Sequence, residues 1–107
     1  MATMNEIYSE IETNLKNNIS KNKGVNGVFQ FDIGGDDPMM FHFKLEDGAP
    51  SISEGSEENP NVTITMESSN FQQMFDGKLK GPMAVMSGKL KIKGDMSLAM
   101  KIENIIK

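Results

Sequence analysis

Few residues in this chain are of the types that catalyse reactions or hold metals, and their spacing does not bring them together. The single histidine, His42, falls on the polar side of an alternating segment beside Lys44, where a solvated side chain is expected rather than a general base. The adjacent acids Asp36-Asp37 and Glu57-Glu58 lie in turn-like stretches, and a cation site would need further carboxylates from elsewhere. Thiol chemistry, disulfides and zinc fingers are excluded because cysteine is absent.

Two further catalytic patterns are also missing. No serine lies in a Gly-x-Ser-x-Gly turn, the pattern that presents a nucleophile in many hydrolases. Gly34-Gly35 lies between two alternating segments, which predicts a hairpin turn rather than a loop that cradles phosphate. We therefore expect no enzyme activity, no cofactor and no metal.

The chain is instead unusual in its methionines, of which it has ten, while tryptophan and arginine are absent. Methionine is unbranched and polarizable, and it recurs on surfaces that adapt to varied apolar partners. The simpler interpretation is that these side chains fill an irregular core. The alternative is that they line a space for an apolar molecule. The candidates for such a lining are Ile64, Met66, Phe71, Met74, Phe75, Met83, Met86, Met96, Met100 and Ile105.

Charge is distributed unevenly along the chain, whose formal net charge is −4. Residues 1–75 hold four lysines against twelve acids, whereas residues 76–107 hold seven lysines against three acids. Nucleic-acid binding is not expected, because the basic third has no arginine for base contacts and adjoins an acidic body. The asymmetry is compatible with orientation toward an anionic membrane surface. A solvated sheet face carrying Lys89, Lys91 and Lys93 is the simpler interpretation.

The length of 107 residues predicts one domain, spanning 1–107, with a core but no room for a large catalytic cleft as well. No stretch approaches the roughly 20 apolar residues of a membrane span. The N-terminus lacks the basic and apolar regions of a signal peptide. These features predict a soluble intracellular protein, and we expect a monomer.

The first half of the chain predicts a helix and a hairpin. Apolar residues recur at helical spacing over residues 3–19 and reach as far as Ile19, and a loop follows over 21–27. Strands are expected at 28–33 and 39–46, joined by the turn Gly34–Pro38. Both strands alternate, and they place a row of aromatic side chains on one face.

The second half predicts three more strands and three helices. The strands lie at 51–54, on an edge, at 62–66 and at 89–93. One short helix begins with a capping box of Ser69 and Gln72 and ends at Gly77, and the next runs from Pro82 to Gly88. A last helix, capped by Asp95, extends from Met96 to the end of the chain. The fold class is therefore α+β, a five-stranded, mostly antiparallel sheet with one face covered by four to five helices.

The last helix has more apolar surface than one contact requires. On a helical wheel its apolar positions cover roughly 220°, whereas packing on a sheet needs about 100°. The helix is therefore buried on two sides, or its second face lines a space meant for something apolar.

The tail carries the most specific motif of the chain, Gly88-Lys-Leu-Lys-Ile-Lys-Gly94 followed by Asp95 and an apolar helix to Ile106. Together with Asn61-Val-Thr-Ile-Thr-Met66 and the segment from Phe71 to Leu79, it resembles the sterol carrier protein type 2 family of lipid-binding domains. The resemblance covers essentially the whole chain, in order. It implies an apolar tunnel between sheet and helices that binds sterols, fatty acids, fatty acyl-CoA or phospholipids.

We therefore expect non-covalent lipid binding, with intracellular lipid transfer as a further role. Lys78, Lys80 and Lys101 are candidates for weak attraction of a charged headgroup, and the segments 71–86 and 100–106 are the expected lid. The alternative is a ligandless protein-interaction domain whose methionine and phenylalanine surface is covered by a partner chain. A further alternative is an accessory domain that presents lipid to an enzyme, since the resembled domain also occurs fused to enzymes.

The end of the chain bears on localisation. Many proteins of the resembled family end in a peroxisomal tripeptide of the Ser-Lys-Leu type, whereas this chain ends Ile105-Ile106-Lys107. We expect a cytoplasmic protein. The tripeptide is either naturally absent, or the chain has been shortened at its end.

Overall fold

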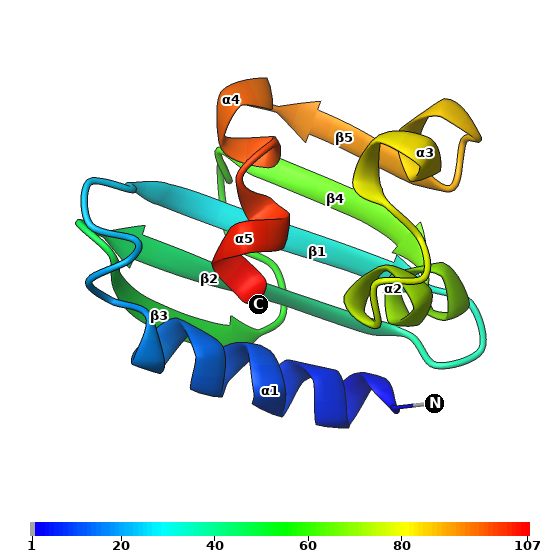
Figure 1. Ribbon diagram of the computed structural model, residues 1–107, viewed down its shortest axis with the longest axis horizontal. Coiled ribbons are helices and arrows are strands. Elements are labelled where there is room, and N and C mark those ends of the chain that lie inside the picture. Colours follow the sequence, from blue (N-terminus) through cyan, green and yellow to red (C-terminus); the bar gives the residue numbers. More distant parts are fainter. Residues whose placement is uncertain (1) are drawn as a thin grey trace.

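Five strands form one mixed sheet, and five helices cover one of its faces (Figure 1). The computed structural model describes residues 2–107, so the first residue of the expected domain lies outside the described residues. In chain order the elements are α1 (Met4–Asn17), β1 (Gly27–Gly34), β2 (Met39–Glu46), β3 (Ala49–Glu54), β4 (Val62–Glu67), α2 (Ser68–Phe75), α3 (Gly81–Met86), β5 (Leu90–Gly94), α4 (Met96–Ala99) and α5 (Ile102–Ile106).

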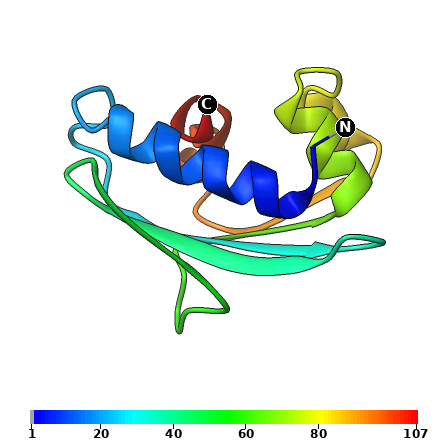
Figure 2. The ribbon, with the colours of Figure 1, turned by 90° about the horizontal axis from the view of Figure 1, so that it is seen from below.

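The strands lie in the order β3-β2-β1-β4-β5, so the sheet is open, with β3 at one edge and β5 at the other. β1 and β4 are parallel, and the three other neighbouring pairs are antiparallel. All the helices lie on the same side of the sheet, as Figure 2 shows from below. The expected α+β fold with a mostly antiparallel sheet is therefore confirmed.

Aromatic side chains on the covered face hold the centre of the core together. Phe29 lies opposite Phe43 and Phe31 opposite Phe41, and the paired rings stack with centroids 4.8 and 4.7 Å apart. Phe71 of α2 packs onto Phe31 with a centroid separation of 5.8 Å. All five rings are fully buried. The aromatic row expected from the alternation of the hairpin is confirmed.

Helix α1 begins within one residue of the predicted start and ends two residues earlier than predicted. The Thr3 hydroxyl accepts a hydrogen bond from the Glu6 backbone N–H, and the Glu6 carboxylate accepts one from the Thr3 backbone N–H. The helix ends at Asn17, and Ile19 lies beyond it with an exposed side chain. The prediction that Ile19 belongs to the apolar face was wrong, because the helix ends before it and residues 18–24 form turns.

Helix α2 starts two residues earlier than predicted. Its N-cap is Glu67, no side chain caps it, and the expected capping box at Ser69 does not form. The preceding residue, Ser68, is buried and its hydroxyl accepts a hydrogen bond from the Asp37 backbone N–H at 3.1 Å. This bond ties the start of α2 to the β1–β2 turn, which draws Ser68 into the helix.

Glycines end both short helices as predicted. Gly77 and Gly88 have φ angles of 82° and 77°, a region that is free of strain only for glycine. At α3, the Gly88 N–H donates to the Val85 carbonyl and the Lys89 N–H donates to the Ala84 carbonyl. These two bonds form a Schellman motif, and α2 ends in the same way at Gly77.

The tail forms two helices rather than the single one predicted. The Lys101 N–H donates to the Leu98 carbonyl, three residues back, so the helical turn tightens between α4 and α5. Because of this bend, the apolar residues of the tail face in two directions. Ile102, Ile105 and Ile106 of α5 enter the core. Leu98 of α4 packs over Gly27 at the start of β1.

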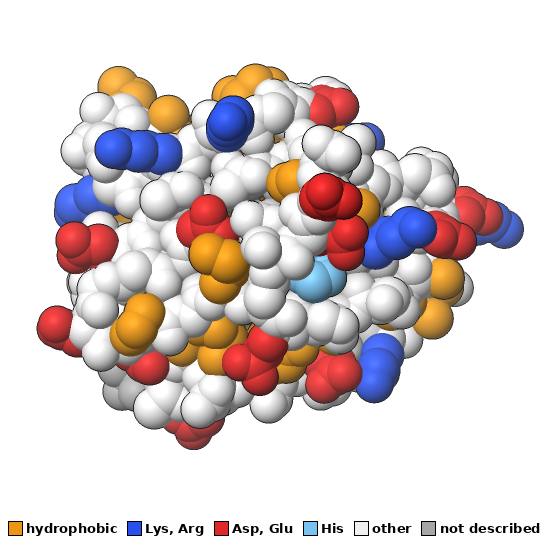
Figure 3. All heavy atoms as spheres, turned by 180° about the vertical axis from the view of Figure 1, so that it is seen from behind, with side chains coloured by type: hydrophobic (Ala, Val, Ile, Leu, Met, Phe, Trp, Pro, Cys, Tyr) orange, Lys and Arg blue, Asp and Glu red, His pale blue; other side chains and the backbone are white. Residues whose placement is uncertain are grey.

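The outer face of the sheet is partly covered by the acidic loop over 55–60, which lies on the side opposite the helices (Figures 2 and 3). His42 was expected to be solvated, but its side chain is only 16% exposed. Its Nδ1 lies 2.9 Å from the Gly55 carbonyl oxygen, and its Nε2 lies 3.4 Å from the Glu57 carboxylate. The sequence identified the polar face correctly but not the loop that folds back over it.

Candidate functional site

An apolar cavity of about 470 Å³ lies over the β5 side of the sheet, between α3 and the tail helices. Its floor is the covered face of β4 and β5. There Ile64 lies directly opposite Ile92, and Leu90 precedes Ile92 by two residues on the same face of β5. Ile64 and Leu90 are buried. Strand alternation explains the floor, because the lysines between these residues point to the other face.

Two short walls and an end complete the cavity. α3 forms one wall, α4 and α5 form the other, and Met74 of α2 closes the end near the core. Neither α3 nor α4 is long enough to be stable by itself, so both depend on their contacts with the sheet. The residues that line the walls are Gly81, Pro82, Val85, Met86, Met96, Ala99, Met100, Ile102, Glu103 and Asn104.

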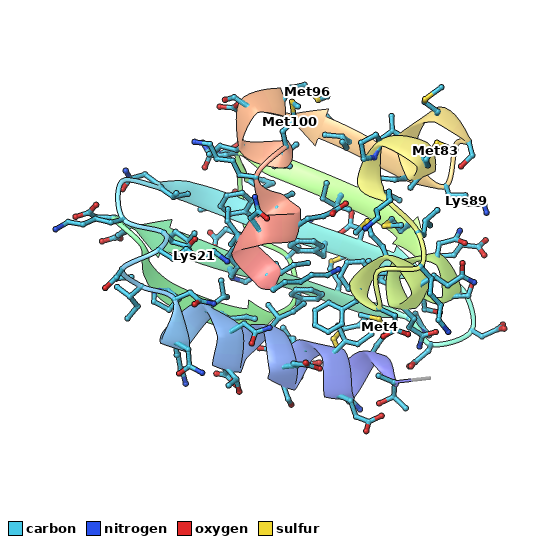
Figure 4. The ribbon with its side chains drawn as sticks, in the orientation of Figure 1. Met4, Lys21, Met83, Lys89, Met96 and Met100 are labelled. Carbon is cyan, nitrogen blue, oxygen red and sulfur yellow. The ribbon has the colours of Figure 1, made fainter. Side chains whose placement is uncertain are left out.

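The cavity opens to solvent at a mouth formed by methionines. Met86 on α3 and Met100 after α4 are 83% and 81% exposed, although both line the cavity. Met96 and Met100 lie together on the tail, and Met83 lies on α3 (Figure 4). Flexible methionine side chains at an open mouth can adapt to ligands of different shape.

One carboxylate lines the apolar cavity, and it is already engaged. Glu103 Oε1 accepts a hydrogen bond from the Gly81 backbone N–H at 2.7 Å, which joins α5 to the first turn of α3. A Cβ at position 81 would displace this carboxylate, so glycine there allows the close approach of Glu103. The amide of Asn104 supplies the other polar side chain of the lining. A ligand in this cavity would therefore meet mainly hydrocarbon.

The structure places five of the ten predicted lining residues in the cavity wall and the other five elsewhere. The five in the wall are Ile64, Met74, Met86, Met96 and Met100. Phe71 and Ile105 are core residues behind the cavity, and Phe75 is half-buried against that core. Met83 is exposed on α3, and Met66 lines a different hollow. Binding of a ligand by any of them stays a prediction.

Sequence reasoning missed several apolar lining residues. Leu90, Ile92, Val85, Ala99 and Ile102 all contribute to the cavity. The strand alternation of β5 and the helical wheel of the tail already placed four of them on inward faces. The prediction selected residues by type, with preference for methionine and phenylalanine, and therefore did not use the strand and helix periodicity.

The three predicted headgroup lysines are exposed and lie in or beside the cavity walls. Lys80 immediately precedes α3, and Lys101 stands between the lining residues Met100 and Ile102. Lys78 lies two residues before Lys80, in the connection from α2. Among residues 2–107 none of the three takes part in an ion pair within 4.0 Å.

A second hollow, of about 670 Å³, surrounds the ends of β1 and β4 and the start of β5. It is the larger of the two, but Asp32, Glu67, Lys89 and Lys91 line it. A mixture of acidic and basic side chains does not suit an acyl chain, because charged groups would lose hydration on contact with hydrocarbon. The apolar cavity is the better candidate site. Within the part of the chain that the structure describes, no three His, Cys, Asp or Glu side chains converge as metal ligands.

Comparison with known proteins agrees with this geometry. The family model described as the SCP-2 sterol transfer family matches residues 9–107. Hydroxysteroid dehydrogenase-like protein 2 from Xenopus laevis is 36% identical over 104 residues, a match that covers 96% of this chain and 24% of that protein. In Xenopus tropicalis the protein of the same name is 41% identical over 85 residues, with 20% of its length covered. The chain thus spans about a fifth to a quarter of these relatives.

Solved structures of similar fold give the same result. Sterol carrier protein 2 from Yarrowia lipolytica in its apo form superposes with a TM-score of 0.72 at 24% identity, covering 94% of this chain and 87% of that chain. Palmitated SCP2L2 from Aedes aegypti superposes with a TM-score of 0.65 at 23% identity and 92% coverage of both chains. The resemblance seen in the sequence is confirmed, and the chain belongs to the SCP-2 sterol transfer family.

Proposed function

We propose that this protein binds lipids non-covalently in the cavity between α3 and the tail helices. The observation that carries the proposal is the cavity itself, whose floor and walls are apolar and whose methionine-rich mouth opens to solvent. Its volume of about 470 Å³ lies within the range of small-molecule sites. Membership of a sterol transfer family supports the same function.

The ligand class is proposed to be broad, including fatty acids, fatty acyl-CoA, sterols and phospholipids. An open mouth lets part of a large ligand remain outside while its hydrocarbon lies in the cavity. Lys80 and Lys101 adjoin the walls and would attract a carboxylate or phosphate left at the mouth, with Lys78 nearby. The palmitated neighbour from Aedes aegypti makes palmitate a sensible first probe.

Binding is tested by titrating a fluorescent fatty acid into the purified protein, with palmitate and cholesterol as competitors. A cavity-filling variant, Ala99→Trp, is designed to occupy the space, because Ala99 is a lining residue and not fully buried. The matched control is Ala49→Trp, on the exposed edge strand β3. Saturable binding by the wild type and the control, and its loss in Ala99→Trp, supports the proposal. Equal binding by all three proteins would place the lipid elsewhere.

A second candidate function is presentation of lipid to an enzyme. The observation that favours it is the coverage of the relatives, since this chain matches about a fifth to a quarter of proteins named as hydroxysteroid dehydrogenase-like. A dehydrogenase-like enzyme that converts a lipid substrate at a higher rate when this protein is present, but not when Ala99→Trp is present, would support this role. Lipid transfer between donor and acceptor vesicles without any enzyme would support independent transfer instead.

A further inference from the structure

The exposed apolar side chains of this protein are concentrated at one edge. Seven large hydrophobic residues are exposed in the described part of the chain, and five of them belong to α3, to α4 or to the residue that follows α4. The five are Met83, Val85, Met86, Met96 and Met100. Figure 4 shows Met83, Met96 and Met100 along the side of the molecule that carries β5. Of the other two, Ile19 follows α1, and Met40 lies on β2 and shares the second hollow with Lys89 and Lys91.

Lysines accompany these apolar side chains. Lys89, Lys91 and Lys93 are exposed on the lysine face of β5 and immediately before it, and none forms an ion pair within residues 2–107. Figure 3 shows hydrophobic and lysine side chains side by side along this edge. Asp32 and Glu67 share the second hollow with Lys89 and Lys91, so part of the positive charge is balanced there. Lys93 is not part of that hollow.

The opposite edge of the molecule is acidic, and the apolar face of its helix is buried. α1 lies along the β3 side, as Figure 1 shows, and carries Glu6, Glu10 and Glu12 against Lys16. Its apolar residues, Met4, Ile7, Ile11 and Leu15, are fully buried. The protein is therefore polarised, with basic and apolar groups at the β5 edge and acidic groups at the α1 edge. An anionic surface would orient it with the β5 edge facing that surface.

We propose that the β5 edge docks onto an anionic lipid bilayer and brings the mouth of the cavity to the membrane surface. The proposal rests on the proposed function, since docking at the mouth shortens the path of a lipid between bilayer and cavity. The exposed methionines enter the boundary between headgroups and acyl chains, and the lysines contact anionic headgroups.

The chemistry of this edge favours a bilayer over a protein partner. Interfaces between proteins are enriched in aromatic residues, methionine and arginine and depleted in lysine, so it is the lysines of this edge and its lack of arginine that favour a bilayer. A second copy docked on the same edge would bring the lysine rows of both copies together, which is unfavourable. A fluid bilayer needs no fixed shape and accepts both flexible methionines and separate positive charges.

Co-sedimentation of the full chain with vesicles tests the proposal. Vesicles of phosphatidylcholine with phosphatidylserine are compared with vesicles of phosphatidylcholine alone, each at low and high salt. The test variant is Met83→Ser with Lys89→Gln, because Met83 is 60% exposed and neither residue lines the cavity. We expect it to lower binding to the anionic vesicles about tenfold. The matched control, Ile19→Ser with Lys23→Gln, changes an exposed hydrophobic residue and an exposed lysine in the loop after α1 and should bind as the wild type does.

Binding of a fluorescent fatty acid without vesicles separates this proposal from the proposed function, and both double variants should retain it. A wild-type protein that binds the fatty acid but not the anionic vesicles overturns docking and leaves lipid binding intact. One that binds the vesicles but no fatty acid supports docking and contradicts the cavity function. Equal loss of vesicle binding in test and control variants overturns the proposal. The proposal is also overturned if the wild-type protein is a dimer in sedimentation velocity and the test variant is a monomer.

Discussion

The Glu103 carboxylate accepts a hydrogen bond from the Gly81 backbone N–H at 2.7 Å, which joins two walls of the cavity. α5, which carries Glu103, is itself fixed on two other sides. The Asn14 amide donates to the Ile106 carbonyl at 3.0 Å, and the Lys107 ammonium donates to the Met74 carbonyl at 3.1 Å. Lys21 also donates to the carbonyl of Asn104 in α5, and Figure 4 shows Lys21 beside that helix. The Glu103 bond therefore joins α3, one wall of the cavity, to a helix that is held in place by other contacts.

Removing the Glu103 carboxylate should loosen this wall. A hydrogen bond of this kind contributes about 1 kcal/mol, so Glu103→Ala should raise amide exchange in residues 81–86 and speed lipid dissociation several-fold. Hydrogen exchange and stopped-flow displacement of a fluorescent fatty acid measure the two effects. Glu103→Gln retains an acceptor oxygen and serves as the control. Faster exchange in α5 but not in α3 would show that Glu103 stabilises its own helix instead.

Affinity for a fatty acid should be about micromolar. Burying about 14 methylenes at about 0.8 kcal/mol each would gain about 11 kcal/mol. Ligand-efficiency limits of about 0.3 kcal/mol for each of about eighteen atoms give only about 5 kcal/mol. The open mouth leaves part of the chain hydrated, so the result lies between these values, with weak discrimination between neighbouring chain lengths. Isothermal titration with a series of fatty acids checks this, and subnanomolar binding of one member alone would contradict it.

Helix α4, which forms part of one cavity wall, should be less stable at low pH. The Ser97 hydroxyl, followed by the backbone N–H of Leu98, hydrogen-bonds the Asp95 carboxylate and holds its pKa below the ordinary value. Because the pKa is lower in the folded state, this stabilisation is fully present above the unfolded pKa and is lost as the pH falls through the folded pKa. Amide exchange of residues 96–101 should therefore rise below the ordinary aspartate pKa. Asp95→Asn caps the helix without titrating in this range, so it should abolish the pH dependence. An unchanged profile in that variant would assign the effect to another group.

Truncation of the central aromatic residue should destabilise the whole fold. Phe31 is fully buried and packs against Phe41, Phe43 and Phe71, so Phe31→Ala should lower the free energy of unfolding by about 3–5 kcal/mol. Urea denaturation followed by circular dichroism measures the loss. Met40→Ala on the outer face is the control, with an expected change within about 0.5 kcal/mol. Comparable losses in the two variants would mean that the aromatic cluster is not the centre of stability.

The sequence predicted those parts of the fold that depend on local periodicity and capping. The alternation of Phe29 and Phe31, the glycine stops at Gly77 and Gly88, and the Asp95 cap are all present in the structure. The break after Ala99 could not be predicted, because no proline or glycine marks it. It accompanies tertiary packing in two directions, in which Leu98 is partly buried over Gly27 and Ile102 enters the core.

The site was predicted less completely than the fold. Residue type identified the methionines of the mouth, such as Met86 and Met100, but also selected Phe71, which belongs to the core. Burial decides between lining and core, and it depends on how α2 is tied to the β1–β2 turn through Ser68. The expected lid was also too broad. α2 and α5 bury their apolar faces, and only α3 and α4 leave theirs open.

Methyl NMR of the methionines tests directly whether lipid binds in the cavity between α3 and the tail helices. Methionines lie at the cavity, in the core and on the outer face, so one experiment compares the three places. The protein is labelled at the methionine methyl groups and titrated with palmitate. We expect large chemical-shift changes for the lining residues Met74, Met86, Met96 and Met100. Met4 in the core and Met40 on the outer face should change little. Shifts confined to Met40 and Met66, which line the second hollow, would contradict it.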